Sequence, residues 1–417
     1  MKLSRFGEKF SSSSGIVSLM DDLGSALNDH PDMLFMGGGN PAHIPAVETA
    51  LQTTLADLAT DSNQCRSLLG IYQPPQGDRS FRQALASFFN KHYGWSISEH
   101  NIALANGSQS AFFILYNLLA GTMANGEQGT IHLPLIPEYI GYADTGISNS
   151  LFTATMPSIE YLEDRLFKYH VDFSKLTLPT STTALCVSRP TNPTGNVLTN
   201  NEIEHLDQLA KQHKIPLIID AAYGLPFPNI LFTKAEPLWN QNIILSLSLS
   251  KLGLPGVRTG IIIASEELIE AFANANTITS LACGNLGPAM GKKLLESNQL
   301  LTLSQQSIRP FYEQRALQTT QWFHNALAGL PYHIHKPEGA IFLWLWLENL
   351  PISSQALYQR LKQRGLLIIP GEAFFIGLDK HWQHSHECIR VSYAQDEKIV
   401  KAGVKIIAEE LKKLYGR

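Results

Sequence analysis

Residues 243–264 read IILSLSLSKLGLPGVRTGIIIA, and this stretch decides the fold. Ile243–Ser248 and Gly260–Ala264 are short, largely continuous apolar runs, which is typical of strands buried on both faces of a parallel sheet. Lys251 and Arg258 stand between them. Open α/β sheets bind ligands beyond the carboxyl ends of their strands, so both cations lie where a ligand is expected.

Four further apolar runs have the same character, and longer amphipathic segments separate them. One such segment begins with a capping box formed by Thr199 and Glu202 and continues with apolar residues at helical spacing. Strands that alternate with helices predict an α/β fold with a large doubly wound, mainly parallel sheet. The four runs are Asn101–Ala105, Thr130–Leu133, Ala184–Ser188 and Leu217–Asp220.

From about residue 304 the pattern changes, and it predicts a smaller α+β domain. The last helical pattern places apolar residues from Val400 to Leu414 on one face. We therefore expect an N-terminal arm over residues 1–45 that packs with the small domain, a large domain over 46–305 and a small C-terminal domain over 306–417. The other expected elements are a helix over 304–327, a strand over Ile341–Leu347, a helix over Gln355–Arg364, and strands over Leu366–Ile369 and Ile389–Tyr393.

Composition narrows the possible functions. The chain has 417 residues, with 32 Lys and Arg against 36 Asp and Glu, so no basic excess favours nucleic-acid binding. The four cysteines form no metal or disulfide motif, and the longest apolar run, Ala340–Leu347, is far shorter than the ~20 residues of a membrane span. The charged start does not resemble a signal peptide. We expect a cytoplasmic protein, and the low charged fraction of 16% is consistent with an oligomer.

Polar residues follow several of the expected strands. Asn106–Ser110 leads into an apolar helix, and a helix N-terminus of this kind binds anions through free backbone N–H groups. A plain turn with a serine cap gives the same pattern. Asp220 ends another strand, where a carboxylate needs a cation or a donor unless it only caps a helix.

Lys251 and the arginines allow two interpretations as well. Lys251 is either a solvated loop lysine or a desolvated amine that forms a Schiff base, and the Pro-Gly turn after it is expected to aim Arg258 at the same pocket. Arg390 lies in an apolar strand and needs an anionic partner, internal or bound. Asn192–Gly195 and Gly37–Pro41 either turn the chain or bring backbone close to a ligand.

These motifs have a characteristic order along the chain. They are Asn-Gly-Ser-Gln at 106–109, Pro-Glu-Tyr at 137–139, Asn-Pro-Thr-Gly at 192–195, Asp-Ala-Ala-Tyr at 220–223, Ser-Leu-Ser-Lys at 248–251, Pro-Gly-Val-Arg at 255–258 and the late Arg390. The set resembles the fold-type-I pyridoxal-phosphate aminotransferases and spans nearly the whole chain. The resemblance implies pyridoxal 5'-phosphate as cofactor, a ping-pong mechanism and a homodimer.

Residue by residue, the resemblance implies the following roles around the cofactor ring. Lys251 holds the cofactor as a Schiff base and moves a proton, and Asp220 pairs with the pyridine nitrogen. Asn192 and Tyr223 donate to the phenolic oxygen of the ring, and Tyr139 stacks on its face. With Lys251 and Asp220, Tyr223 completes the expected catalytic group.

The resemblance also implies a phosphate site and a substrate site. Tyr72 reaches the phosphate from the neighbouring subunit. Arg390 binds the substrate α-carboxylate, and Gly38, Gly39 and Asn192 line the substrate side. The phosphate-binding residues of the same subunit are Gly107, Ser108, Gln109, Ser248, Ser250 and Arg258.

The substrates that the resemblance implies are small aliphatic amino acids such as valine and alanine, with the 2-oxo acids pyruvate and 2-oxoisovalerate. A lyase or decarboxylase on the same fold is an alternative, because the catalytic residues barely distinguish these reactions. A ligand-binding regulator or an inert binding module is a further alternative. His381, His384 and His386 lie close together, but no neighbouring carboxylate or cysteine cluster favours a metal site.

Overall fold

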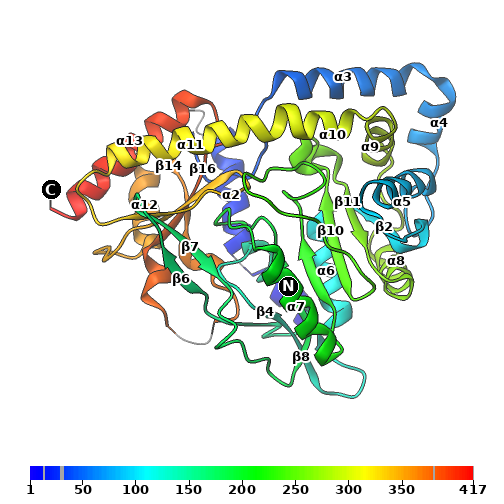
Figure 1. Cartoon of the computed structure of the whole chain (residues 1–417), viewed down its shortest axis with the longest axis horizontal. Helices are drawn as coiled ribbons and strands as arrows, with labels where there is room; N and C mark the ends of the chain where they lie inside the picture. The colour runs from blue at the N-terminus through cyan, green and yellow to red at the C-terminus, as the bar shows by residue number, and fades with distance from the viewer. Residues whose placement is uncertain (13–14, 29–31, 379–380, 417) are drawn as a thin grey trace.

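A computed structural model describes residues 1–12, 15–28, 32–378 and 381–416, and it is built around two sheets (Figure 1). Within these residues the larger sheet has eight strands in the order β2-β11-β10-β9-β8-β4-β3, with β5 paired to β4. All six strands expected in this region are present. The bounds are β2 Ile102–Ala105, β3 Gly121–Thr122, β4 Gln128–Leu133, β5 Phe152–Ala154, β8 Thr182–Ser188, β9 Leu217–Asp220, β10 Ile243–Ser248 and β11 Gly260–Ile263.

Helices cover both faces of this sheet, which explains the continuous apolar runs. Successive strand residues point to opposite faces, so Leu185 joins one core cluster and Cys186 the other. One face packs on α5 (Arg79–Tyr93), α7 (Asn200–His213) and α9 (Leu286–Glu296). The opposite face packs on α6 (Ser108–Leu119) and α8 (Glu266–Ser280).

The central strands β4, β8, β9 and β10 are parallel, as expected, but β11 is not. It pairs antiparallel with both β10 and β2, which corrects the expectation of a parallel strand at Gly260–Ala264. The physical reason is the short connection over residues 249–259. A parallel crossover needs a dozen or more residues and usually a helix, whereas this segment makes only two 3₁₀ turns, η3 (Ser250–Leu252) and η4 (Pro255–Val257).

The second sheet combines C-terminal strands with a hairpin from the middle of the chain. In the described part of the chain it has six strands in the order β15-β16-β13-β12-β7-β6. The hairpin β6–β7 joins it through a parallel pairing of β7 with β12, in which Leu166 lies opposite Ile334. This sheet therefore takes in residues 158–170, and the domain boundaries remain a prediction. The bounds are β6 Ser158–Tyr161, β7 Leu166–His170, β12 His333–His335, β13 Phe342–Trp346, β15 Ile369–Pro370 and β16 Cys388–Ser392.

Long helices flank the two sheets. The expected helix over 304–327 is a π-helical segment, η5 (Ser304–Ile308), that runs directly into α11 (Arg309–Ala326). The capping box of Thr199 and Glu202 opens α7 as expected. The remaining helices are α1 Arg5–Phe10, α2 Gly15–Asn28, α3 Pro45–Thr60, α4 Ser62–Gly70, α10 Gln299–Leu303, α12 Ser354–Gln363 and α13 Glu397–Leu414, with short turns η1 Glu99–Asn101, η2 Ile140–Tyr142, η6 Gly371–Phe374 and η7 Gln383–Glu387.

The N-terminal segment bridges the two sheet regions. Strand β1 (Leu34–Phe35) pairs parallel with β14 (Leu366–Leu367). In α2, the Asp22 carboxylate accepts hydrogen bonds from Tyr358 and from Lys362 Nζ, the latter at 2.6 Å, while Gly15 lies against Ile140. This arrangement holds α2 between α12 and the loop that carries Tyr139.

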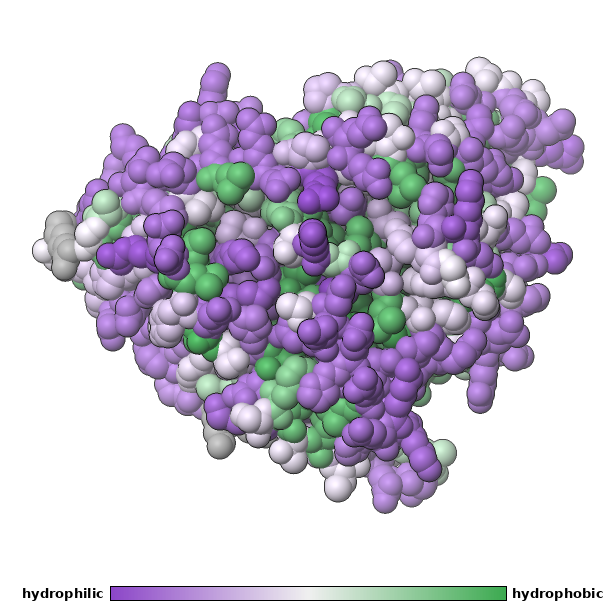
Figure 2. Space-filling model, viewed as in Figure 1, coloured by the Kyte–Doolittle hydropathy of each residue, from purple (hydrophilic) through white to green (hydrophobic). Residues whose placement is uncertain are grey.

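The face of the molecule in Figure 2 is covered mainly by hydrophilic residues, with hydrophobic ones in separate patches. Among the described residues, no helix is both long and apolar enough to cross a membrane.

Candidate active site

A cavity of about 270 Å³ lies at the carboxyl ends of β8, β9 and β10. It collects nearly all the residues that the sequence singled out, from seven separate segments of the chain. The exceptions are Gly107, which lies just behind the wall against Arg258, and Tyr72, which is 81% exposed. The predicted residues on the wall are Gly38, Gly39, Ser108, Gln109, Tyr139, Asn192, Asp220, Tyr223, Ser248, Ser250, Lys251, Arg258 and Arg390.

The Lys251 amine enters the cavity from η3, just beyond the end of β10. Its Nζ donates to the Gly39 carbonyl at 2.5 Å and lies 5.2 Å from the centre of the Tyr223 ring. Burial lowers the pKa of Lys251 to about 8, and the positive charges of Arg390 and Arg258 act in the same direction. Near neutral pH the neutral, nucleophilic fraction of this amine is therefore far larger than that of an ordinary lysine, although the protonated form still predominates.

Asp220 lies at the end of β9 with its carboxylate held by two donors. The Tyr142 hydroxyl donates to Oδ2 at 2.6 Å, and the Ala222 backbone N–H donates to Oδ1 at 3.0 Å. Burial raises the pKa of Asp220, whereas these hydrogen bonds and the charge of Lys251 oppose that rise. The arrangement favours a carboxylate that faces a cationic group in the cavity.

The N-terminus of α6 forms an anion cradle with Arg258. Gly107 caps the helix with φ of 89°, and a Cβ at this position would lie 2.1 Å from Arg258 Nη2, so only glycine allows the approach. Arg258 itself adopts φ of 45° after the Pro-Gly turn, which aims its side chain back as expected. The buried Ser108 Oγ has no hydrogen-bond partner among the residues that the structure describes. Free helix N–H groups, an unpartnered hydroxyl and a guanidinium suit a phosphate group.

Arg390 is buried in β16 without a carboxylate partner in the described part of the chain. Its Nη1 donates to Asn192 Oδ1 at 2.7 Å, its Nη2 donates to the Gly37 carbonyl at 2.6 Å, and its Nε has no partner. The guanidinium lies 4.0 Å from the centre of the Phe342 ring. Burial lowers the pKa of Arg390 to about 10, so the group stays charged and available to a bound carboxylate.

The structure adds residues that the sequence did not single out. Tyr142 reaches Asp220, and its position three residues after Tyr139 in a turn was the available signal. Ile16, Met20 and Phe35 form an apolar side of the cavity. These three come from the N-terminal segment, and only tertiary packing brings them to the site.

Gly38 has a steric role beside this apolar side. A Cβ at Gly38 would lie 2.1 Å from Cε1 of Phe35. Glycine at this position therefore lets the Phe35 ring lie against the backbone and keeps the cavity open.

The histidines of the stretch 381–386 contact different groups in the structure. His384 is buried and hydrogen-bonded to Tyr169, whereas His386 lies 3.2 Å from a Glu372 oxygen. No group of histidine, cysteine and carboxylate side chains suited to a metal ion occurs among the described residues.

The cavity thus combines a nucleophilic amine, a buried carboxylate, an anion cradle and a second guanidinium with an unpartnered nitrogen. These groups fit pyridoxal phosphate, which carries an aldehyde, a basic ring nitrogen and a phosphate.

Comparison with known proteins identifies the class. The family model of class I and II aminotransferases matches residues 42–407, and the chain belongs to this family. It therefore is a pyridoxal-phosphate-dependent aminotransferase with the fold-type-I architecture that the motifs predicted.

Among individual proteins, the chain is 51% identical to the valine–pyruvate aminotransferase of Escherichia coli over 415 residues, which cover 100% of this chain and 99% of that protein. The crystal structure of valine–pyruvate aminotransferase from Salmonella typhimurium LT2 matches with a TM-score of 0.89 and 51% identity, covering 97% of this chain and 100% of that one. A putative amino-acid aminotransferase from Psychrobacter arcticum matches with a TM-score of 0.97 and 47% identity over 100% of both chains.

Replacement of Tyr142 by Phe tests the support of Asp220. The variant loses the O–H that donates to Oδ2, so the Asp220 pKa rises further and less of its charge remains. We expect kcat/KM to fall about tenfold, in line with a hydrogen bond to a charged group. Tyr116→Phe is the matched control, because the Tyr116 hydroxyl contacts Cys186 Sγ and not Asp220. Equal losses in both variants would contradict the assignment.

The lowered pKa of Lys251 predicts a pH dependence for cofactor capture by the apoprotein. Only the neutral amine attacks an aldehyde, so the rate should rise about tenfold per pH unit well below the pKa and level off above about pH 8. Stopped-flow absorbance with pyridoxal phosphate measures this rate, and Nα-acetyl-lysine serves as the reference amine. A rate that rises through pH 10 in parallel with the reference would show that Lys251 is an ordinary solvated lysine.

Proposed function

We propose that the chain transfers amino groups between small aliphatic L-amino acids, such as valine and alanine, and the 2-oxo acids pyruvate and 2-oxoisovalerate. The observation that carries this proposal is the full-length 51% identity to the valine–pyruvate aminotransferase of Escherichia coli. The cavity supports it independently. In the described part of the chain its cationic lining consists of Lys251, Arg258 and Arg390, and Ile16, Met20 and Phe35 contribute apolar surface.

Charge matching then favours an aliphatic substrate. We assign Lys251 and Arg258 to the cofactor, which leaves Arg390 for the α-carboxylate and no further cation for a side-chain carboxylate. The apolar groups of Ile16, Met20 and Phe35 suit a short hydrocarbon side chain.

Toward the cofactor, we infer the roles that the motifs predicted. Asp220 would pair with the pyridine nitrogen, Tyr139 would pack on the ring, and Asn192 and Tyr223 would donate to its phenolic oxygen. Asn192 is already tied to Arg390, so one side chain would connect the cofactor and substrate sites. The phosphate-binding residues are Gly107, Ser108, Gln109, Ser248, Ser250 and Arg258, of which Ser250 is hydrogen-bonded to Arg258 and to Ser248.

The mechanism follows from these positions. Bound pyridoxal phosphate supplies an electron sink that makes the Cα–H bond of the amino acid acidic. Arg390 grips the α-carboxylate and orients that bond. The neutral amine of Lys251 would remove the Cα proton as a general base. Both half-reactions use the same residues in turn, so the kinetics should be ping-pong.

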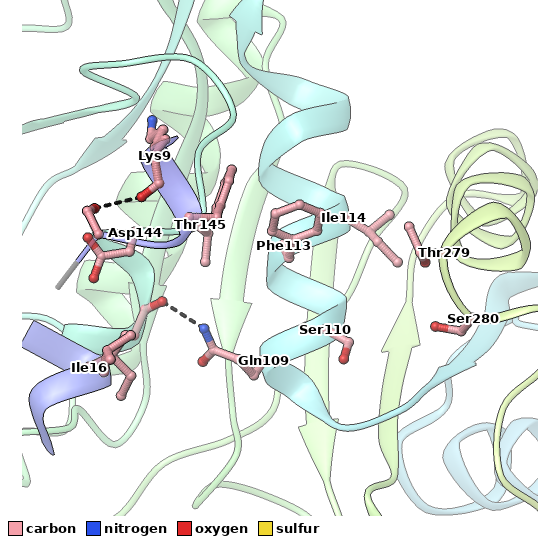
Figure 3. Close-up of a pocket in the computed structure, with 14 residues that line it drawn as sticks. Lys9, Ile16, Gln109, Ser110, Phe113, Ile114, Asp144, Thr145, Thr279 and Ser280 are labelled. Atoms are coloured by element: carbon pink, nitrogen blue, oxygen red, sulfur yellow. Dashed lines mark hydrogen bonds between the residues drawn. The ribbon is translucent and has the colours of Figure 1, made fainter. Parts of the chain in front are cut away.

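We also infer a homodimer in which Tyr72 serves the neighbouring active site. Within its own chain Tyr72 is 81% exposed, and Leu69 and Ile71 beside it are 80% and 53% exposed. A second cavity of about 600 Å³ adjoins the first at Gln109, and Figure 3 shows it between the N-terminal segment, α6 and the end of α8. A partner subunit that covers this cavity would bring its own segment 69–72 near the N-terminus of α6.

Location and domain division belong to the same proposal. The four free cysteines agree with a reducing, cytoplasmic setting. We retain an arm over residues 1–45, a large domain over 46–305 and a small domain over 306–417, with the hairpin β6–β7 extending the sheet of the small domain.

The reaction is tested with purified holoenzyme, L-valine and pyruvate. We expect alanine and 2-oxoisovalerate to form together and only with an acceptor present, with L-aspartate a much poorer donor. Lys251→Ala should fold but lose about 10⁴-fold in kcat, because general-base catalysis contributes up to that factor. Release of 2-oxo acid or CO₂ from valine without an acceptor would instead identify a lyase or decarboxylase.

Mixed dimers test the position of Tyr72. Lys251→Ala and Tyr72→Ala subunits with different affinity tags are exchanged, and the hybrid is isolated on both tags. If Tyr72 acts across the interface, each hybrid has one intact site and about half of the wild-type activity. If Tyr72 acts within its own chain, the hybrid has no intact site and is no more active than its two parents.

A further inference from the structure

Glu138 is a buried carboxyl group that the proposed mechanism does not use. It is 0% exposed and lies between Pro137 and Tyr139, on the loop behind the cavity. The Ser188 backbone N–H donates to its Oε1 at 2.8 Å, the Ser188 hydroxyl is hydrogen-bonded to its Oε2, and the Tyr139 N–H lies 3.3 Å from the same oxygen. Three donors from two cavity-lining residues therefore converge on one carboxyl group.

The three hydrogen bonds stabilise a negative charge on Glu138, whereas burial opposes that charge more strongly. The titratable groups that act on it or feel it are Asp220 on β9, Tyr142 in η2, Tyr116 on α6 and Cys186 on β8. Burial raises the pKa of both tyrosines and of the cysteine well above the usual range, so these three stay neutral. Asp220 adds a like charge. Burial, with this repulsion, raises the pKa of Glu138 to about 8.

The proton on Glu138 determines what Ser188 can do. A serine hydroxyl has one proton to donate and can also accept. While Glu138 is ionised, the Ser188 hydroxyl donates to Oε2, which is the hydrogen bond present in the structure. Once Glu138 is protonated, its own O–H donates to Ser188 Oγ, and the Ser188 proton is free to turn elsewhere.

The other direction open to Ser188 is the cavity. Ser188 lies on the cavity wall at the end of β8, and its Cα is the register partner of Asp220 on β9. A hydroxyl released from Glu138 therefore lies beside the carboxylate that faces the ligand.

We propose that Glu138 is a positioning residue that sets the direction of the Ser188 hydroxyl: into the cavity while Glu138 is protonated, and back to Glu138 once it is ionised. The ligand that gains a hydrogen bond from this hydroxyl is the cofactor, whose ring occupies the cavity in the proposed function. This role rests on the cofactor site of the proposed function, but it is independent of which amino acid the enzyme accepts.

Binding measurements in a Lys251→Ala background test this role, because the cofactor then binds without a covalent bond and Lys251 does not titrate. Equilibrium dialysis gives the dissociation constant of pyridoxal phosphate with Glu138 or with Glu138→Gln, from about pH 6.5 to about pH 9.5. Glutamine mimics the protonated acid, since its NH₂ group donates to Ser188 Oγ at every pH. Titration of the cofactor itself cancels in the ratio of the two constants.

The dissociation constant of the Glu138 protein divided by that of the Glu138→Gln protein should be about one at low pH. Above about pH 8 this ratio should rise to about five, because the Glu138 protein then loses one hydrogen bond to the cofactor. A ratio that stays flat across the range overturns the proposal. Addition of Ser188→Ala to both proteins should abolish the rise. A rise that persists without the Ser188 hydroxyl means that the charge of Glu138 acts directly, which overturns the role assigned to the hydroxyl.

Infrared spectroscopy of the full-length holoenzyme supplies a second readout that does not depend on turnover or on the folding of a variant. Wild-type protein should show the C=O stretch of a protonated carboxyl group that disappears as the pH rises through about 8. Ser188→Ala should retain this band, and Glu138→Gln, where it folds, should lack it. Absence of the band from wild-type protein at about pH 6.5 would show that Glu138 is already ionised and would refute the switch.

Discussion

Desolvation of charge is the constraint on which the rest of this site depends. Lys251, Asp220 and Arg390 all hold their charged atoms in a cavity, where an ion without partners is strongly destabilised. The protein compensates each group only in part. The Lys251 amine donates one hydrogen bond to a carbonyl, and the Asp220 carboxylate accepts two hydrogen bonds. Arg390 donates two hydrogen bonds, while its Nε has no partner among the described residues. Bound anions and a bound cationic ring nitrogen would complete these partial sets, so the site is organised for a ligand before the ligand arrives.

The parallel sheet makes that organisation possible. In the register of β8, β9 and β10, Ser188 lies opposite Asp220, and Asp220 lies opposite Ser246, so neighbouring strands end at one edge. The helices that cover both faces fix this edge. The antiparallel strand β11 then returns the chain past the same edge and allows Arg258 to reach Gly107 at the start of α6. One sheet edge thereby supports the amine, the carboxylate and the anion cradle together.

Local patterns predicted much of this architecture, and long-range pairings account for what they missed. Six of the eight strands of the large sheet, the capping box of α7 and the apolar face of α13 were evident because each depends on residues within one segment. The pairing of Leu166 with Ile334 joins segments far apart in the sequence and leaves no local signal. The same distinction divides the site. Strand-end residues could be predicted, whereas Ile16 and Phe35 reach the cavity only through the packing of the N-terminal segment. Tyr72 stays a prediction.

The two buried carboxyl groups near the site, Asp220 and Glu138, have different electrostatic surroundings. Asp220 receives the Tyr142 hydroxyl and the Ala222 N–H and lies near the positive charge of Lys251. Glu138 receives donors from Ser188 and Tyr139, has no cation among its hydrogen-bond partners in the described part of the chain, and feels the charge of Asp220. Burial raises the pKa of both groups, to about 8 for Glu138, and the positive charge of Lys251 opposes the rise at Asp220. The cavity wall thus sets the carboxyl group of Asp220 against the cationic groups of Lys251, Arg258 and Arg390. This imbalance favours a ligand set with two anionic groups, as a phosphorylated cofactor and an amino-acid carboxylate provide.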